Sequence, residues 1–273
     1  MKVPFTKMQG AGNDFVLIDN RTLSLSLTPA QAIRICDRFR GVGAAGILLW
    51  EKSRTGVADW AWTFLQSDGD TADMCGNGAR CFGRFVHDNV GNRDPFTFET
   101  GAGVVAVAAA PDNTIAIALP APKDVCFHET IALQQSPTTT VHFANTGVPH
   151  AVLFVADVHA VDVQSVGREV RYHAHYAPRG TNVNFVQVLG HNRLAIRSYE
   201  RGVEVETLAC GTGVAAAVLV AARTHQFTSP VRVNVESGDC LEIRFEDDGT
   251  TFSHVYLIGP AEPTFSGEID LSF

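Results

Sequence analysis

The chain has 273 residues, a formal net charge of −8 at pH 7, and a composition that is 45% hydrophobic and 18% charged. This is the profile of a folded globular protein, and the length suits two domains of roughly 100–150 residues each. The basic residues are scattered, so we expect no nucleic-acid partner, because such binding rests on neutralising many phosphates.

Taken in chain order, the predicted elements are mostly strands. Helices are predicted for Pro29–Phe39 (with Thr28 as its cap), for Gly76–Asp88 and for Gly211–Thr224. The third is apolar on all sides, which is typical of a helix buried inside a curled sheet. Strands are predicted for residues 15–18, 47–50, 104–108, 114–119, 151–155, 183–188, 193–199, 231–235 and 241–245. The result is an α+β fold with two pseudo-symmetric domains, each a curled mixed sheet wrapped around a central helix.

Two motifs occur twice, which indicates an internal duplication. Gly10–Asp19 and Gly147–Asp157 each contain a glycine turn, one polar side chain and an apolar strand that ends in Asp. Ala72–Phe82 and Thr207–Ala217 each contain Cys-Gly-x-Gly. The two offsets, 137 and 135 residues, are nearly equal, which favours two related domains that face each other.

Prolines mark the middle of the chain, at Pro120, Pro122 and Pro137. We expect residues 1–122, completed by a C-terminal strand at 264–273, to form one half, and residues 123–263 to form the other. The active site is expected in the cleft between the halves.

Each Cys-Gly-x-Gly motif places its cysteine, Cys75 or Cys210, at the start of a predicted helix. A helix N-terminus presents unpaired backbone N–H groups and a partial positive charge, so a thiol there ionises more readily, and the thiolate is the reactive form. The glycines leave the amides open to a carboxylate. If the two turns face each other, one thiolate can remove the α-proton of a bound amino acid while the other thiol returns a proton to the opposite face. Because the amides stabilise the developing charge, we expect no cofactor and no metal.

The alternative is that these are buried packing residues, the commonest role of a free cysteine. Two matched motifs at equivalent points of a duplication weigh against it. A Cys75–Cys81 metal pair is disfavoured because six residues along a helix place the two side chains on different faces. We assign packing roles to Cys36, Cys81, Cys126 and Cys240.

The motifs together resemble the diaminopimelate epimerase family over nearly the whole chain. They occur in family order at Met8–Phe15, Asp73–Arg80, Gly147–His150, Gly180–Phe185, Tyr199–Gly202 and Glu206–Gly213. The resemblance implies interconversion of LL- and meso-diaminopimelate without pyridoxal phosphate, in lysine and cell-wall precursor biosynthesis. It also makes a homodimer a fair expectation.

The resemblance further implies roles for individual residues. Cys75 and Cys210 would be the acid/base pair, and His150 and Glu200 would orient and polarise the thiols. The distal carboxylate would be held by Asn182 and Arg201, since a guanidinium suits a planar bidentate contact. The substrate-binding set is Asn13 (for the α-amino group), Gln66, Gly76, Asn77, Asn182, Glu200, Arg201, Gly211 and Thr212.

Three positions depart from the family pattern. Gln66 and Val148 each stand where many members have Asn, and Ala45 stands where Asp is frequent. The first two lie in the expected distal pocket, so they affect the identity of the substrate more than the type of reaction.

Other enzyme classes fit less well. Gly41–Gly46 matches GxGxxG, but a helix precedes it and a strand follows it, the reverse of a dinucleotide-binding turn. No lysine lies in the second half or in a glycine-lined turn, which disfavours a pyridoxal-phosphate racemase. His173 and His175 lack a ligand partner at metal spacing and are expected in a polar loop.

Two readings on the same fold stay open. One is a cofactor-independent racemase of another amino acid, and the other is a silent amino-acid-binding protein. The N-terminal residues lack the apolar core of a signal peptide, and the longest run of small apolar residues, Val214–Ala222, is far short of the ~20 residues that a membrane span needs. We therefore expect no membrane partner and a cytoplasmic location.

Overall fold

The computed structural model describes residues 1–134 and 136–272, which divide into two units by their internal contacts. The first unit contains Met1–Ile117 and Gly259–Phe273, and the second contains Ala118–Ile258. The domain division predicted from the sequence, residues 1–122 with 264–273 and residues 123–263, stays a proposal. None of the helices in the described part of the chain is long and apolar enough to cross a membrane.

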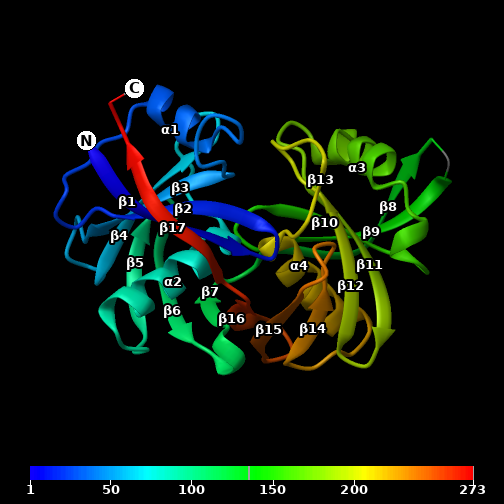
Figure 1. Ribbon diagram of the computed structural model, residues 1–273. Coiled ribbons are helices and arrows are strands. Elements are labelled where there is room, and N and C mark those ends of the chain that lie inside the picture. Colours follow the sequence, from blue (N-terminus) through cyan, green and yellow to red (C-terminus); the bar gives the residue numbers. More distant parts are fainter. Residues whose placement is uncertain (135, 273) are drawn as a thin grey trace. The chain divides into compact units, whose positions relative to one another are not determined.

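The first unit is a mixed sheet around one long helix (Figure 1). Its strand β17, from near the C-terminus, pairs with β1, so segments far apart in the chain lie side by side. The elements of this unit are β1 (Lys2–Gly10), β2 (Asn13–Asp19), α1 (Pro29–Cys36), β3 (Gly46–Lys52), β4 (Trp60–Gln66), α2 (Gly76–Val90), β5 (Phe96–Thr100), β6 (Gly103–Ala109), β7 (Ile115–Ala118) and β17 (Glu262–Asp270).

The second unit has the same plan, with α4 as its long central helix. A shorter helix, α3, packs against β11 and β12. The elements are β8 (Lys123–Leu133), β9 (Ser136–Asn145), β10 (Pro149–Phe154), α3 (Val163–Arg171), β11 (Asn182–Gly190), β12 (Arg193–Tyr199), β13 (Glu206–Thr207), α4 (Gly211–Thr224), β14 (Val231–Asn234), β15 (Cys240–Asp247) and β16 (Phe252–Gly259).

The order of strand pairing is repeated in the two units. From β17 through β1 to β7 the neighbours pair antiparallel, antiparallel, parallel, antiparallel, parallel, antiparallel and antiparallel. From β8 to β16, with β13 set aside, the pairs follow the same order. The α+β fold with two related halves, predicted from two short motifs, is therefore confirmed.

Each central helix is enclosed by strands of its own unit. Helix α2 packs against β1, β2, β3 and β6, and α4 packs against β9, β10, β11, β12 and β15. Residues Gly213 to Ala222 of α4 are all buried, and most are alanine or valine. Small apolar side chains keep the helix thin and leave no polar face, so its stable position is inside the curled sheet.

Helix α1 ends earlier than the sequence predicts. Thr28 caps it as expected, in a reciprocal capping box with Gln31. The helix stops at Cys36 rather than Phe39, because the Asp37 carboxylate accepts hydrogen bonds from the backbone N–H groups of Phe39 and Arg40, both at 2.8 Å. Such a side chain competes with the helix for backbone donors and turns the chain away.

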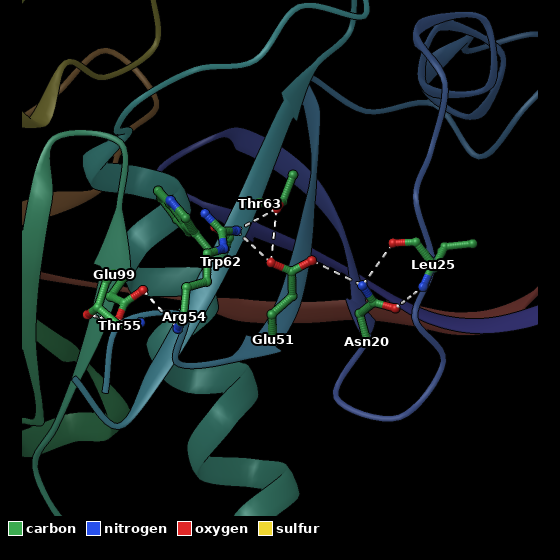
Figure 2. Close-up of polar contacts among 8 residues, drawn as sticks. All are labelled: Asn20, Leu25, Glu51, Arg54, Thr55, Trp62, Thr63 and Glu99. Carbon is green, nitrogen blue, oxygen red and sulfur yellow. Dashed lines mark hydrogen bonds and ion pairs between the residues drawn. The ribbon is translucent and has the colours of Figure 1, made fainter. Parts of the chain in front are cut away.

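A polar network secures the loops at one edge of the first unit (Figure 2). Asn20 closes the loop after β2 through hydrogen bonds with the backbone of Leu25, and its Nδ2 also donates to Glu51 at 3.1 Å. Arg54, in the loop between β3 and β4, donates to both Glu51 (2.6 Å) and Thr63 (2.7 Å). These hydrogen bonds connect the loop to the two strands.

Glu99 on β5 holds the same loop from the other side (Figure 2). Its carboxylate accepts hydrogen bonds from the hydroxyls of Ser53 and Thr55 and from the backbone N–H of Arg54. The two hydroxyl contacts, foremost among several hydrogen bonds, lower the pKa of Glu99 to about 2. The loop therefore depends on an ionised carboxylate.

Candidate active site

Cys75 is the N-cap residue of α2 and belongs to the first unit. Its backbone is extended (φ −145°, ψ 122°), and its carbonyl oxygen accepts the first helical hydrogen bond, from Ala79 at 2.8 Å. Gly76 and Asn77 follow in the first turn, whose backbone N–H groups precede the regular hydrogen-bond pattern of the helix. Asn13, at the start of β2, donates from Nδ2 to the Cys75 sulfur at 3.8 Å. The structure thus brings together these four residues of the expected site.

Arg80, one turn further along α2, holds the Asn77 side chain in the first turn of the helix. The Arg80 side chain is fully buried, its Nη2 donates to Asn77 Oδ1 at 3.0 Å, and its Nε donates to the carbonyl oxygen of Pro260 at 3.2 Å. The sequence motif included Arg80 without giving it a role. The available signal was a cation at a helix position whose neighbours are apolar, because a buried charge needs dedicated partners.

Gln66 lies at the exposed end of β4. Its position is set by the backbone, which pairs with Gly46 of β3 and donates to the carbonyl oxygen of Asp70 at 2.8 Å. Its part in the substrate pocket stays a prediction.

Cys210 is the N-cap residue of α4 and belongs to the second unit. Like Cys75 it has an extended backbone (φ −111°, ψ 101°), and Gly211 and Thr212 form the first turn. Cys210 is only 7% exposed, and its sulfur lies 3.7 Å from Thr212 Oγ1. Both cysteines predicted to begin helices therefore do so.

His150, on β10, is fully buried and joins the Cys210 turn through Thr212. Its Nε2 lies 2.9 Å from Thr212 Oγ1, and its Nδ1 lies 3.2 Å from Asn184 Nδ2. Burial, assisted by the positive charge of Arg201, lowers the pKa of His150 to about 3. The imidazole is therefore neutral at physiological pH and acts through hydrogen bonds rather than through charge.

Glu200 follows β12 and is the second polar partner of Cys210. Burial raises the pKa of its carboxyl group, while hydrogen bonds with Thr207 and Cys210 act in the opposite direction. The Thr207 hydroxyl donates to Glu200 Oε1. A thiol hydrogen-bonded to a buried carboxylate can pass its proton to that carboxylate, which is a requirement for forming a thiolate.

Asn182 and Arg201 lie together, as the sequence predicts. Asn182 Oδ1 accepts from the backbone N–H of Arg201 at 2.7 Å, and its Nδ2 donates to the carbonyl oxygen of Pro149 at 3.2 Å. Arg201 also lines a cavity of about 790 Å³ within the second unit, together with Val148 and Arg179. Asn182 thus positions the backbone of Arg201, while the guanidinium Nη1 donates to the carbonyl oxygen of Arg179 at 3.3 Å.

The other four cysteines divide into two pairs. Cys36 and Cys81 are buried, and desolvation raises the pKa of each thiol to about 12, as expected of packing residues. The packing role assigned to Cys126 and Cys240 is wrong, because both are exposed. Each lies on a strand (β8 or β15) whose side chains alternate between the interior and the solvent, and each falls at an outward position.

The His173–His175 segment forms a short helical turn in a polar loop. His175 pairs with Glu129 at 3.2 Å, and His173 Nε2 contacts the carbonyl oxygen of Ala132. Among residues 1–134 and 136–272, no group of three or more His, Cys, Asp or Glu side chains is arranged to hold a metal ion.

A family model and full-length relatives match this sequence. The family model described as diaminopimelate epimerase matches residues 5–120 and 142–263. A diaminopimelate epimerase from Methanocella arvoryzae is 40% identical over 285 residues, covering 100% of this chain and 98% of the relative. One from Hydrogenobaculum sp. is 39% identical over 277 residues and covers 96% of each chain.

Solved structures show the same fold at much lower identity. A phenazine biosynthesis protein of the PhzF family from Bacillus anthracis has a TM-score of 0.73 at 13% identity, covering 98% of this chain and 99% of that one. A hydroxyproline epimerase from Agrobacterium vitis, with bound trans-4-hydroxy-L-proline, has a TM-score of 0.73 at 13% identity and coverages of 98% and 92%. The family model includes both cysteine motifs and the sequence relatives extend over nearly the full length, so the chain belongs to the diaminopimelate epimerase family.

Proposed function

We propose that this protein is an isomerase that converts LL-diaminopimelate to meso-diaminopimelate, with Cys75 and Cys210 as its acid/base pair. The observation that carries the proposal is the matched position of the two thiols. Each is the N-cap of the buried central helix of one of two repeated units, in a chain that belongs to the diaminopimelate epimerase family.

The proposed reaction has two proton transfers. The thiolate of one cysteine takes the α-hydrogen as a proton, so the C–H bond breaks, an S–H bond forms, and the electron pair passes into the carboxylate. The thiol of the other cysteine then gives its proton to the opposite face of the α-carbon and becomes a thiolate. One stereocentre is inverted and no atom is gained or lost apart from this exchange. The reaction therefore requires no oxidant, reductant or electron acceptor.

Backbone amides stabilise the intermediate in this proposal. The first-turn N–H groups of Gly76, Asn77, Gly211 and Thr212 would hold the α-carboxylate, where negative charge develops. Asn13 would contact the α-amino group. His150 and Glu200 would tune Cys210, which is consistent with their hydrogen bonds to its turn and to its thiol.

The distal end of the substrate would lie near Asn182, Arg201 and Gln66. Arg201 suits a carboxylate, and Asn182 holds its backbone. We further propose a cytoplasmic homodimer that serves lysine and cell-wall precursor biosynthesis. The dimer is tested by light scattering of the purified protein, where a monomer mass at micromolar concentration would refute it.

The deciding experiment follows exchange of the substrate α-hydrogen in D2O by NMR. The wild type is expected to incorporate deuterium into LL-diaminopimelate and to form the meso isomer. Cys75→Ser and Cys210→Ser should each lower turnover at least about 100-fold, because an alcohol is a far weaker acid than a thiol and cannot serve as the base. Circular dichroism establishes that the variants are folded. A near-normal rate in either variant, or no exchange in the wild type, would count against the proposal.

A second candidate is a racemase of a different amino acid with the same chemistry. It is favoured by one observation: Val148, an apolar residue where many family members have Asn, lines the same cavity as Arg201. The same exchange assay on lysine, ornithine, histidine and glutamate discriminates the two candidates. Faster exchange on one of these than on LL-diaminopimelate would select the second.

A further inference from the structure

Asn184 is a buried carboxamide in the middle of β11, two residues beyond Asn182 on the same strand face. Its Nδ2 donates to the carbonyl oxygen of Ala151 at 2.9 Å and lies 3.2 Å from His150 Nδ1. Its Oδ1 accepts from the Ser198 hydroxyl at 2.9 Å. Both ends of the amide are therefore engaged inside the protein.

The orientation of this amide follows from the chemistry of its partners. A backbone carbonyl oxygen can only accept a hydrogen bond, so the nitrogen of Asn184, and not its oxygen, must face Ala151. The second hydrogen of the same nitrogen then faces His150 Nδ1. A ring nitrogen opposite an N–H donor must act as an acceptor, so Nδ1 of His150 carries no proton.

The position of the remaining imidazole proton decides whether the Thr212 hydroxyl accepts a hydrogen bond from His150 or donates one to it. His150 is neutral, because burial lowers its pKa to about 3. Its single proton must then be on Nε2, which donates to Thr212 Oγ1 over 2.9 Å. Thr212 accepts this hydrogen bond, and its own hydroxyl hydrogen is left to donate to the Cys210 sulfur at 3.7 Å.

We propose that Asn184 is a positioning residue that fixes the tautomer of His150 and, through Thr212, supplies a hydrogen-bond donor to the thiolate of Cys210. In the opposite tautomer Thr212 would donate to His150 and the sulfur would lose this donor. A hydrogen bond to a charged group stabilises that charge, so the network favours the thiolate. The inference rests on the proposed function, in which Cys210 acts as acid and base.

Two further features agree with this role. At Gly213, a Cβ atom would lie 2.3 Å from Asn184 Oδ1, so the second glycine of the motif gives the amide the space it occupies. In the first unit, Asn13 donates directly to the sulfur of Cys75. Each cysteine therefore has a neutral donor, direct for Cys75 and relayed through Thr212 for Cys210. Of the charged groups, Glu200 is hydrogen-bonded to Cys210 itself, and Arg201 acts electrostatically on His150.

The test compares Asn184→Leu, which removes the amide at similar size, with Ser198→Ala, which removes only the contact to Oδ1. Nitrogen-15 NMR of histidine-labelled protein reports the tautomer, with the His150 signals assigned by their loss in His150→Asn. The wild type and Ser198→Ala should show the Nε2-protonated form. Asn184→Leu should show a mixture or the Nδ1-protonated form.

The second measurement follows alkylation of Cys210 by iodoacetamide between pH 6 and 10, with the modified peptide quantified by mass spectrometry. Asn184→Leu and Thr212→Val should each raise the midpoint by about one pH unit, a tenfold loss of thiolate at pH 7. Thr212→Ser, which keeps the hydroxyl, should restore the wild-type midpoint. In an active enzyme, the limb of the pH profile in which kcat/KM rises with pH should shift by the same amount in Asn184→Leu, while KM changes little.

Three outcomes overturn the inference: an Nδ1-protonated His150 in the wild type, an unchanged tautomer in Asn184→Leu, or an unchanged midpoint in Thr212→Val. If Asn184→Leu fails to fold, the inference is still tested by the tautomer of His150 in the wild type and by the alkylation midpoints of Thr212→Val and Thr212→Ser. Neither the NMR nor the alkylation measurement needs turnover. A wild type with the expected tautomer but without α-hydrogen exchange on any amino acid refutes the proposed function instead.

Discussion

Glu200 is a carboxyl group held inside the second unit beside a thiol. Its raised pKa, caused by burial, means that the folded state favours the protonated form. Such a group contributes to stability below its unfolded pKa of 4.5, and this contribution is lost as pH rises. Keeping it ionised near neutral pH costs stability, so we infer that Glu200 serves chemistry rather than folding.

We expect Glu200→Gln to have opposite effects on activity and stability, because burial raises the pKa of Glu200. Turnover should fall by about 10²–10⁴-fold, because the amide cannot take the thiol proton. Stability should not fall, and relative to the wild type it should increase as pH rises from 4.5 towards 8. Thermal unfolding at intervals across this range measures the effect. A variant less stable than the wild type at pH 8 would show that the carboxylate is structural.

At the same scale, the sequence predicted which cysteines begin helices, and the family resemblance implied His150 and Glu200 as their partners, but it did not indicate Asn184. Cys75 and Cys210 could be identified because each precedes a Gly-x-Gly turn and a predicted helix. Asn184 could not, because its partner Ser198 is across the β11–β12 pair, and register is not encoded in any short segment. The sequence offered one signal for Asn184: it lies two residues after Asn182, and residues two apart on a strand lie on the same face.

At the scale of elements, the second glycine of each Cys-Gly-x-Gly motif has a different environment. A Cβ atom at Gly213 would lie 2.3 Å from Asn184 Oδ1 and 3.3 Å from the Cys210 sulfur. At Gly78, in α2, it would lie 3.4 Å from the ring of Phe15, which is ordinary van der Waals contact. Two equivalent positions of the duplication therefore differ in how well they accommodate a side chain larger than that of glycine.

We expect Gly213→Ala to lower the free energy of unfolding by about 1–3 kcal/mol, because the added methyl group displaces the buried amide. Turnover should fall about tenfold or more through misplacement of Cys210. Gly78→Ala is the matched control and should change stability by less than about 1 kcal/mol, since alanine favours helix and fits the space. Urea unfolding and steady-state assays compare the two. Equal losses in both variants would contradict this account.

The elements that were not predicted are helix α3 and strands β1, β4, β5, β8, β9, β13 and β16. Among them β4 and β16 bury more than half of their residues, whereas α3 and β8 have few buried positions. Helix α3 buries only Val163, Gly167 and Val170, and β8 alternates between solvent and interior with polar side chains. Segments with few buried positions give weak periodicity, because tertiary contacts rather than local preference determine them. The early end of α1 had a local cause, the Asp37 side chain, and could have been found.

At the scale of the whole molecule, a cluster of histidines ties stability to pH. His142 on β9 is 4% exposed, its ring centroid lies 4.8 Å from that of His128, and Phe154 lies between it and His225 at the end of α4. Burial, with smaller effects of His128 and His225, lowers the pKa of His142 from 6.5 to about 4. The folded state therefore holds the neutral form and resists its protonation.

A histidine with a lowered folded-state pKa leaves stability intact above the unfolded pKa of 6.5 and reduces it as pH falls towards 4. The loss over this window should be at most about 3 kcal/mol. His142→Phe should show a shallower decline, and His159→Gln, at an exposed histidine, should follow the wild type. Chemical unfolding at pH 7, 5.5 and 4 makes the comparison, and parallel declines in all three proteins would exclude His142 as the cause.

The pairing of β17 with β1 has a consequence for synthesis on the ribosome. The residues of the first unit emerge first, but their sheet lacks β17 until the entire second unit has been translated. During that interval β1 has an open edge, and an unpaired strand edge attracts other strands. The first unit, which is synthesised first, is therefore completed last. Until β17 is available, the open edge of β1 has to be kept from pairing with other strands.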